Sequence, residues 1–144
     1  MNEERSSMDL AVTKQELQHL LSEVAFTRQY GFVVHTIADG VCSLNVPFQA
    51  LFERPGGIVS GQVFMAAADV AMWLAIMTKL GLRDQSVTVE MKTNFLQGVR
   101  QEPFLCTATI LKPGKRLIYG VAECMSTHGT LLTHHTITYM RLES

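Results

Sequence analysis

The chain has 144 residues, of which 47% are hydrophobic and 17% are charged, and its formal net charge is −1. This length suits one domain with a hydrophobic core, so we expect a single domain over residues 1–144, with residues 1–12 as a loose lead-in. The high hydrophobic fraction excludes an intrinsically disordered chain. A near-neutral charge without a basic stripe argues against nucleic acid as a partner.

The cysteines and the N-terminus favour a cytoplasmic protein. Cys42, Cys106 and Cys124 are odd in number and share no short spacing, which favours reduced thiols over a disulfide framework or a zinc site. The first residues are charged and no apolar stretch follows them, so we expect no signal peptide. His134 and His135 are adjacent in a predicted strand and point to opposite faces, so we expect no metal site.

The first part of the chain predicts a helix and a hairpin. The run Thr13-Lys14-Gln15-Glu16 is a capping-box pattern ahead of a short amphipathic helix. Two β-like runs follow at residues 31–38 and 41–48, and the Asp39-Gly40 turn separates them. The Pro55-Gly56-Gly57 sequence then breaks the chain in a loop.

A long apolar helix is predicted next, from about Ser60 to about Leu80, with Gly81 as its C-terminal stop. A membrane-spanning helix would need ~20 consecutive apolar residues. The longest unbroken apolar run here extends only from Val70 to Met77. We therefore expect a buried core helix and no membrane partner.

The rest of the chain is predicted to form strands, at residues 86–96, 104–111, 116–126 and 130–142. Strict alternation in the first of these puts Phe95 on one face, and Thr88 and Asn94 on the other. A helix that is apolar on nearly all sides must be covered on most of them. The sequence therefore predicts an α+β hot-dog fold, a curved antiparallel β-sheet wrapped around one long central helix, with its free edge closed by dimerisation.

Asp69 is the one carboxylate in this apolar helix. A buried charge costs several kcal/mol unless it has a partner, so Asp69 either pairs with an Arg or Lys or takes part in a reaction. The free backbone amides at the helix start, at Gly61 and Gln62, can polarise a carbonyl oxygen. Gly61 and Asp69 are ~12 Å apart along one helix, so one carbonyl group cannot contact both. If both act on one substrate, they come from two copies of the chain.

The run Gly57-Ile58-Val59-Ser60-Gly61-Gln62, followed by Ala67-Ala68-Asp69, resembles the phenylacetate-pathway (PaaI-type) branch of hot-dog acyl-CoA thioesterases. The Val89–Leu96 run, the Gly114–Leu117 turn and the Thr138-Tyr139 strand are also similar, so the resemblance covers about residues 30–142. It implies hydrolysis of an acyl-CoA thioester, with no cofactor besides the coenzyme A of the substrate. It also implies a homodimer, and we expect dimers to pair into a homotetramer.

The pattern of that family is Asn, Gly and then His-Gly-Gly ahead of a catalytic Asp. Gly57, Gly61 and Asp69 match it. The match implies that Asp69 is the base or the nucleophile and that the Gly61 amide polarises the thioester carbonyl.

Three positions depart from the pattern: Arg54 stands in place of the Asn, Ser60 in place of the His, and Gln62 in place of the last Gly. The roles of the family Asn and His therefore do not carry over to Arg54 and Ser60. We expect substrate contacts from Ser60, Gln62, Gly57, Arg54, Trp73, Asn94 and Phe95.

Several alternatives stay open. Because Arg54 and Ser60 replace the polar pair, the chain could instead be a non-catalytic acyl-CoA-binding protein. A hot-dog dehydratase is disfavoured, since no His lies between His35 and His128. Ser60 is favoured as a helix N-cap over a nucleophile, because the Gly-x-Ser-x-Gly elbow is absent. Arg100 is one of four basic residues that either meet the phosphates of coenzyme A or are solvated surface charges.

Overall fold

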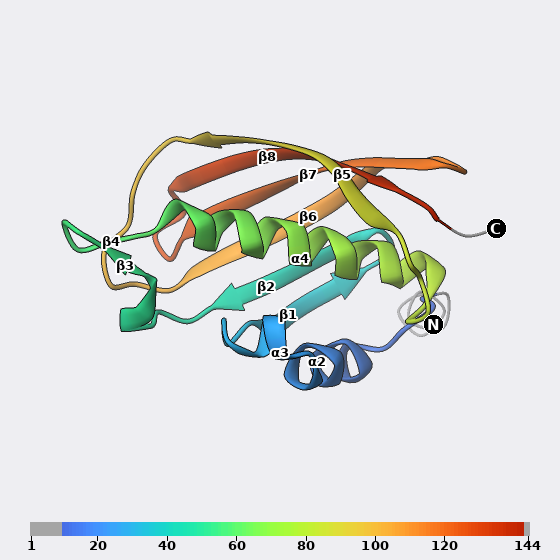
Figure 1. Cartoon of the computed structure of the whole chain (residues 1–144), viewed down its shortest axis with the longest axis horizontal. Helices are drawn as coiled ribbons and strands as arrows, with labels where there is room; N and C mark the ends of the chain where they lie inside the picture. The colour runs from blue at the N-terminus through green and yellow to red at the C-terminus, as the bar shows by residue number, and fades with distance from the viewer. Residues whose placement is uncertain (1–9, 143–144) are drawn as a thin grey trace.

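The computed structural model describes residues 10–142 (Figure 1). The helices are α2 (Lys14–Glu23), α3 (Ala25–Arg28) and α4 (Gly61–Leu80), with a 3-10 turn η1 at Ala50–Phe52. The strands are β1 (Val33–Ala38), β2 (Val41–Val46), β3 (Glu53–Arg54), β4 (Ile58–Val59), β5 (Val87–Phe95), β6 (Phe104–Pro113), β7 (Leu117–Ser126) and β8 (Leu131–Met140).

Six of these strands form one antiparallel sheet in the order β1-β2-β6-β7-β8-β5, and α4 runs along its concave side (Figure 1). Strands β1 and β5 are the two edges of this sheet, while β3 and β4 form a separate small hairpin. The α+β hot-dog fold predicted from the sequence is confirmed, including the Asp39-Gly40 turn between β1 and β2. The β3–β4 hairpin and the short helix α3 were not predicted from the sequence.

The sheet covers most of α4, as expected for a helix that is apolar on nearly all sides. Leu74, Ile76 and Met77 are among its fully buried side chains, and they pack into the main core. The helix is long and apolar enough to cross a membrane, but its burial inside the sheet is that of a core helix. A stripe of α4 is left less covered, and its members repeat every three or four residues: Gln62, Met65, Ala66, Asp69 and Trp73.

The predicted alternation along β5 is wrong at one point. The β5–β8 pairing shifts between Thr88 and Glu90, which is a β-bulge or similar irregularity. Thr88 pairs with Tyr139 and faces α4, so it lies on the same face as Phe95 rather than on the opposite face. The bulge adds one residue to the strand, and a period of two cannot detect it from sequence.

The two main helices begin differently. Thr13 accepts a hydrogen bond from the Glu16 N–H at 3.1 Å, and the Glu16 side chain accepts one from the Thr13 N–H at 2.9 Å, which confirms the capping box. Ser60 stands at the N-cap of α4, but its side chain makes no capping bond. Its hydroxyl donates instead to Oε1 of Gln62.

The N-terminal segment is fixed where the structure describes it. The predicted loose lead-in covers residues 1–12, and residues 1–9 lie outside the described part. Within the remainder, the Ala11 N–H donates to the Thr78 carbonyl at 2.9 Å, and Val12 is buried. The prediction is therefore wrong for residues 10–12, because this segment closes the core at the end of α4.

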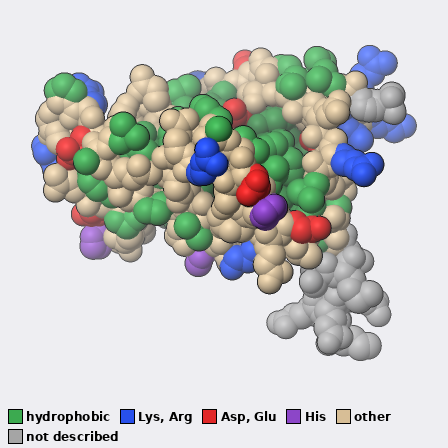
Figure 2. Space-filling view, turned by 60° about the horizontal axis from the view of Figure 1, so that its bottom comes forward, with side chains coloured by type: hydrophobic (Ala, Val, Ile, Leu, Met, Phe, Trp, Pro, Cys, Tyr) green, Lys and Arg blue, Asp and Glu red, His purple; other side chains and the backbone are tan. Residues whose placement is uncertain are grey.

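The three cysteines are thiols inside the fold. Cys42, Cys106 and Cys124 are free and buried. Burial raises the pKa of Cys42 to about 12, so this group is a neutral thiol. On the face shown in Figure 2, basic and acidic side chains lie interspersed among apolar ones.

The difference between the two helix starts gives a stability prediction. Thr13→Ala removes a side-chain cap and should lower the free energy of unfolding by about 1 kcal/mol. Ser60→Ala removes no cap and should change it by less than ~0.5 kcal/mol. Urea unfolding followed by circular dichroism measures both values, and equal losses in the two variants would contradict the assignment.

Candidate active site

The first backbone amides of α4 are free to bind a ligand. The Ser60 N–H donates to the Phe52 carbonyl at 2.8 Å, and the Val63 N–H donates to the Ser60 carbonyl at 3.0 Å. The N–H groups of Gly61 and Gln62 have no acceptor within residues 10–142. Unpaired amides at the positive end of a helix dipole attract a carbonyl oxygen or an oxyanion.

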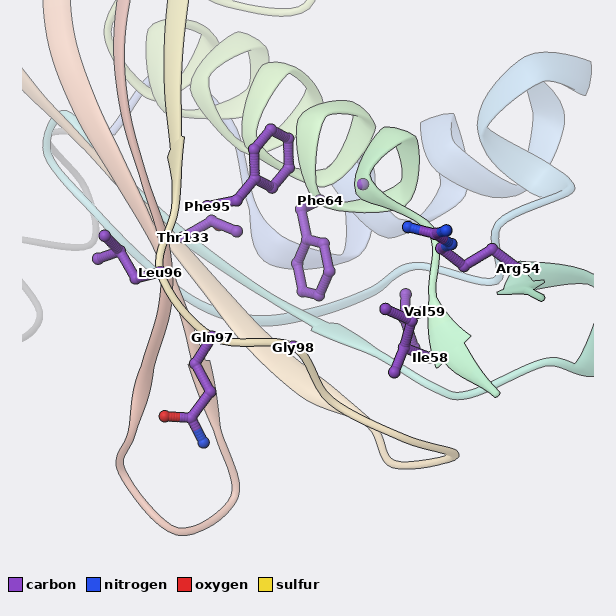
Figure 3. A pocket seen from close by; sticks show the side chains of 10 residues that line it. Arg54, Ile58, Val59, Phe64, Phe95, Leu96, Gln97, Gly98 and Thr133 are labelled. Atoms are coloured by element: carbon purple, nitrogen blue, oxygen red, sulfur yellow. The ribbon is translucent and has the colours of Figure 1, made fainter. Parts of the chain in front are cut away.

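A cavity of about 400 Å³ opens beside these amides (Figure 3). It is lined by Arg54, Ile58, Val59, Gly61, Phe64, Phe95, Leu96, Gln97, Gly98 and Thr133. The walls are mainly apolar, and of these residues only Arg54 carries a charge. Figure 3 shows Arg54 extending from β3 toward the first turn of α4. The cavity can therefore take an apolar acyl group whose carbonyl lies at the helix start.

The lack of a side chain at Gly61 lets the Phe95 ring lie close to the start of α4. A Cβ atom built there would lie 3.0 Å from Cε1 of Phe95, which is tighter than most real contacts. The Phe95 ring therefore covers the helix start and forms one wall of the cavity. Of the residues predicted to contact substrate, Arg54 and Phe95 line the same cavity as Gly61.

The loop that carries Arg54 is held in place by residues 97–101. The Val59 N–H donates to the Val99 carbonyl at 2.9 Å, and Arg100 donates from Nη1 to the Gly56 carbonyl at 2.6 Å. Gly57 has a φ of +79° in the turn between β3 and β4, a conformation that favours glycine. Gly57 thus serves the turn and does not line the cavity, and Arg100 anchors this loop.

Asp69 lies two turns along α4 from Gly61, outside the lining of this cavity. Its Oδ1 atom accepts hydrogen bonds from the Thr88 hydroxyl at 2.6 Å and from the Tyr139 hydroxyl at 2.7 Å. In the described part of the chain the salt bridges are Lys79–Asp39 and His134–Glu123, so Asp69 has hydroxyl partners in place of an Arg or Lys.

The Tyr139 hydroxyl is a neutral donor. Burial, followed by the negative charge of Asp69, raises the pKa of Tyr139 above that of an ordinary tyrosine. A half-buried carboxylate that is held by two hydroxyls, with no cation paired to it, suits acid–base or nucleophilic chemistry.

The remaining predicted substrate residues lie in different places. Ser60 and Gln62 are at the helix start, where they bond to each other. Trp73 lies one turn beyond Asp69 on the less covered stripe of α4 and does not line the cavity at Gly61. Asn94 pairs with His134 and lies on the face of β5 opposite Phe95, so the geometry separates it from Gly61.

Sequence reasoning missed Thr88 and Tyr139 as partners of Asp69. The bulge in β5 hid Thr88, because alternation placed it on the outer face. Tyr139 lies in a segment that resembled the family, but the sequence did not show that its hydroxyl contacts α4. In the fold, Tyr139 lies opposite Thr88 on β8 and its hydroxyl reaches Asp69. The sequence signal for this contact was a tyrosine on the buried face of a strand, because a buried Tyr hydroxyl usually has a hydrogen-bond partner.

Among the described residues, no histidine lines the cavity at Gly61 or bonds to the Asp69 side chain. His134 and His135 lie on opposite faces of β8, as predicted: His134 is 3.9 Å from Glu123, and His135 is buried between Thr93 and Thr133. Within residues 10–142, no three His, Cys, Asp or Glu side chains are grouped so that they could hold a metal ion.

Comparisons with known proteins identify the family of this chain. Residues 56–133 match the family model of the thioesterase superfamily, and this range contains the helix start and Asp69. A protein of Saccharolobus solfataricus that carries an esterase name is 32% identical over 98 residues, which is 68% of this chain and 69% of that protein.

Two solved structures show the same fold. A protein of Silicibacter sp. TM1040 that is named as a thioesterase is 29% identical, with a TM-score of 0.82 over 93% of this chain and 94% of that one. The E. coli PaaI protein, from the phenylacetic acid degradation operon, is 14% identical, with a TM-score of 0.81 over 90% of this chain and 93% of that one. We conclude that the chain belongs to the thioesterase superfamily and is a hot-dog hydrolase of thioesters.

Proposed function

We propose that the protein hydrolyses acyl-CoA thioesters to a free acid and coenzyme A, at sites shared by two copies of the chain. The observation that carries this proposal is that the Gly61 amide and the Asp69 carboxylate lie at two separate places along α4. Gly61, whose N–H has no acceptor within residues 10–142, lines an apolar cavity whose lining contains no carboxylate. Asp69 stands two turns away, on the stripe that the sheet does not fully cover.

The less covered stripe of α4 and the β5 edge support a homodimer. Apolar side chains are exposed there in the part of the chain that the structure describes: Met65, Val89, Phe95 and Leu96. Edge strands in native proteins are protected, and a second copy of the chain protects this one. Two antiparallel α4 helices in contact would place the partner's Asp69 near Gly61, and Trp73 would face the same contact.

The reaction follows from this arrangement. The acyl group occupies the cavity and its carbonyl oxygen accepts a hydrogen bond from the Gly61 N–H, with the Arg54 guanidinium at the same end of the cavity. The partner's Asp69 then acts by one of two routes. It attacks the carbonyl carbon to give an anhydride that water hydrolyses, or it takes a proton from the attacking water. In both routes the C–S bond breaks and the coenzyme A thiol leaves.

Replacement of Asp69 tests the activity itself. Purified protein should release free thiol from at least one member of a panel of phenylacetyl-, benzoyl-, and short and medium straight-chain acyl-CoAs. Asp69→Asn should lower kcat by at least about a hundredfold, because the amide is neither a base nor a nucleophile. The assay is colorimetric detection of the thiol.

Asp39→Asn is the matched control, because Asp39 is an exposed carboxylate that pairs with Lys79 away from the cavity. It should keep wild-type kcat. Retained turnover in Asp69→Asn would remove the proposed role, whereas saturable acyl-CoA binding without thiol release in wild type would favour the binding-protein alternative.

A pair of substitutions at Gly61 tests the amide. Gly61→Pro removes the N–H, and proline is favoured at the first position of a helix. The preceding Ser60 has φ −63° and ψ 143°, which suits a residue before proline. Gly61→Ala adds the same Cβ beside Phe95 and keeps the N–H. We expect Gly61→Pro to lower kcat at least about tenfold below Gly61→Ala, as measured by thiol release. Equal rates would show that the amide plays no part.

Mixing inactive chains tests whether each site is shared. Asp69→Asn and Gly61→Pro chains, unfolded together and refolded at equal concentration, should recover roughly one quarter of the wild-type activity, because half of the dimers carry one intact site. Each variant refolded alone is the control. No recovery, with mixed dimers present by native mass spectrometry of size-tagged chains, would place both groups of a site in one chain.

A further inference from the structure

We propose that Tyr139 is a positioning residue for this chemistry: together with Thr88 it holds one oxygen of the Asp69 carboxylate and leaves the other oxygen to react. The inference rests on the proposed function and adds to it which carboxylate oxygen reacts and what orients it.

Three contacts carry the inference. The Tyr139 hydroxyl lies 2.7 Å from Asp69 Oδ1 and 2.9 Å from the Asp69 backbone carbonyl. The Thr88 hydroxyl lies 2.6 Å from the same Oδ1. A carboxylate oxygen has two acceptor positions, so these two donors occupy both positions on Oδ1. Oδ2 has no hydrogen-bond partner in the described part of the chain and is the oxygen left for substrate or water.

The burial of the three side chains shows which of them fixes the position. Tyr139 is 4% exposed and belongs to the main core, so its ring cannot move without disturbing the packing. Thr88 is exposed, and Asp69 is intermediate. The tyrosine is therefore the rigid element, and it also contacts the backbone of the residue that it orients.

The register of the sheet makes this contact possible. Thr88 and Tyr139 are opposite each other on β5 and β8, at the position where the pairing of these strands shifts. The shift turns Thr88 toward α4, so both hydroxyls converge on one atom. Bulges re-aim side chains in this way beside active sites.

A catalytic carboxylate must be held in a narrow range of orientations, since small misplacements lower rates strongly. Loss of a donor frees rotation of the Asp69 side chain without removing the carboxylate. The expected result is a fall in kcat with little change in KM, because substrate binding depends on the cavity and the Gly61 amide.

The experiment compares four variants in the thiol-release assay, with the acyl-CoA that wild type hydrolyses. Tyr139→Phe keeps the ring and removes the hydroxyl, and should lower kcat roughly tenfold with KM within about twofold. Thr88→Val should act in the same direction, while Thr88→Ser, which retains the hydroxyl, should restore most of the rate. Tyr119→Phe, on an exposed tyrosine of β7, is the matched control and should keep wild-type kcat.

The outcomes separate this inference from the proposed function. Turnover that Asp69→Asn abolishes and Tyr139→Phe leaves unchanged would overturn the positioning role and leave the proposed function in place. No turnover in wild type on any acyl-CoA would overturn both. If Tyr139→Phe does not fold, as judged by circular dichroism, the Thr88 pair decides: equal rates for Thr88→Val and Thr88→Ser overturn the inference, and a rate restored only by serine supports it.

Discussion

The structure depends on the burial of one helix, α4, inside a curved antiparallel sheet. Nearly every side of α4 is apolar, so its burial fixes the direction of the helix and brings its first turn beside the edge strand β5. The fixed position of that turn has a chemical consequence. The Ser60 side chain does not cap it, so the amides of Gly61 and Gln62 are oriented by the whole core and have no acceptor within the described residues.

The same burial explains why the polar chemistry is divided. The sheet leaves one stripe of α4 less covered, and Asp69 is the charged residue of that stripe, where Tyr139 and Thr88 replace the hydration that the carboxylate loses. The cavity at Gly61 is formed at another place, by the first turn of α4 together with the β3–β4 hairpin, the end of β5 and Thr133 of β8. One chain therefore presents the two groups of the proposed acyl-transfer site at two places on one helix.

The resemblance to the PaaI-type family and the geometry contribute different information. The match to the thioesterase superfamily supports thioester hydrolysis, and the matched range contains Gly61 and Asp69. The geometry adds what the residues of this chain do at the positions where the chain departs from the family pattern. Arg54 reaches the helix start in place of the family Asn, and Ser60 bonds to Gln62 in place of capping the helix.

The sequence by itself determined the order of the main elements, the central helix and the two positions, Gly61 and Asp69, around which the candidate site is built. These depend on local signals, namely apolar periodicity, turn residues and spacing along one helix. Tertiary structure alone decided the partners of those residues. A bulge in β5 turned Thr88 inward, and the packing of β8 against α4 brought the Tyr139 hydroxyl to Asp69. Strand register arises from long-range pairing, so no local pattern contains it.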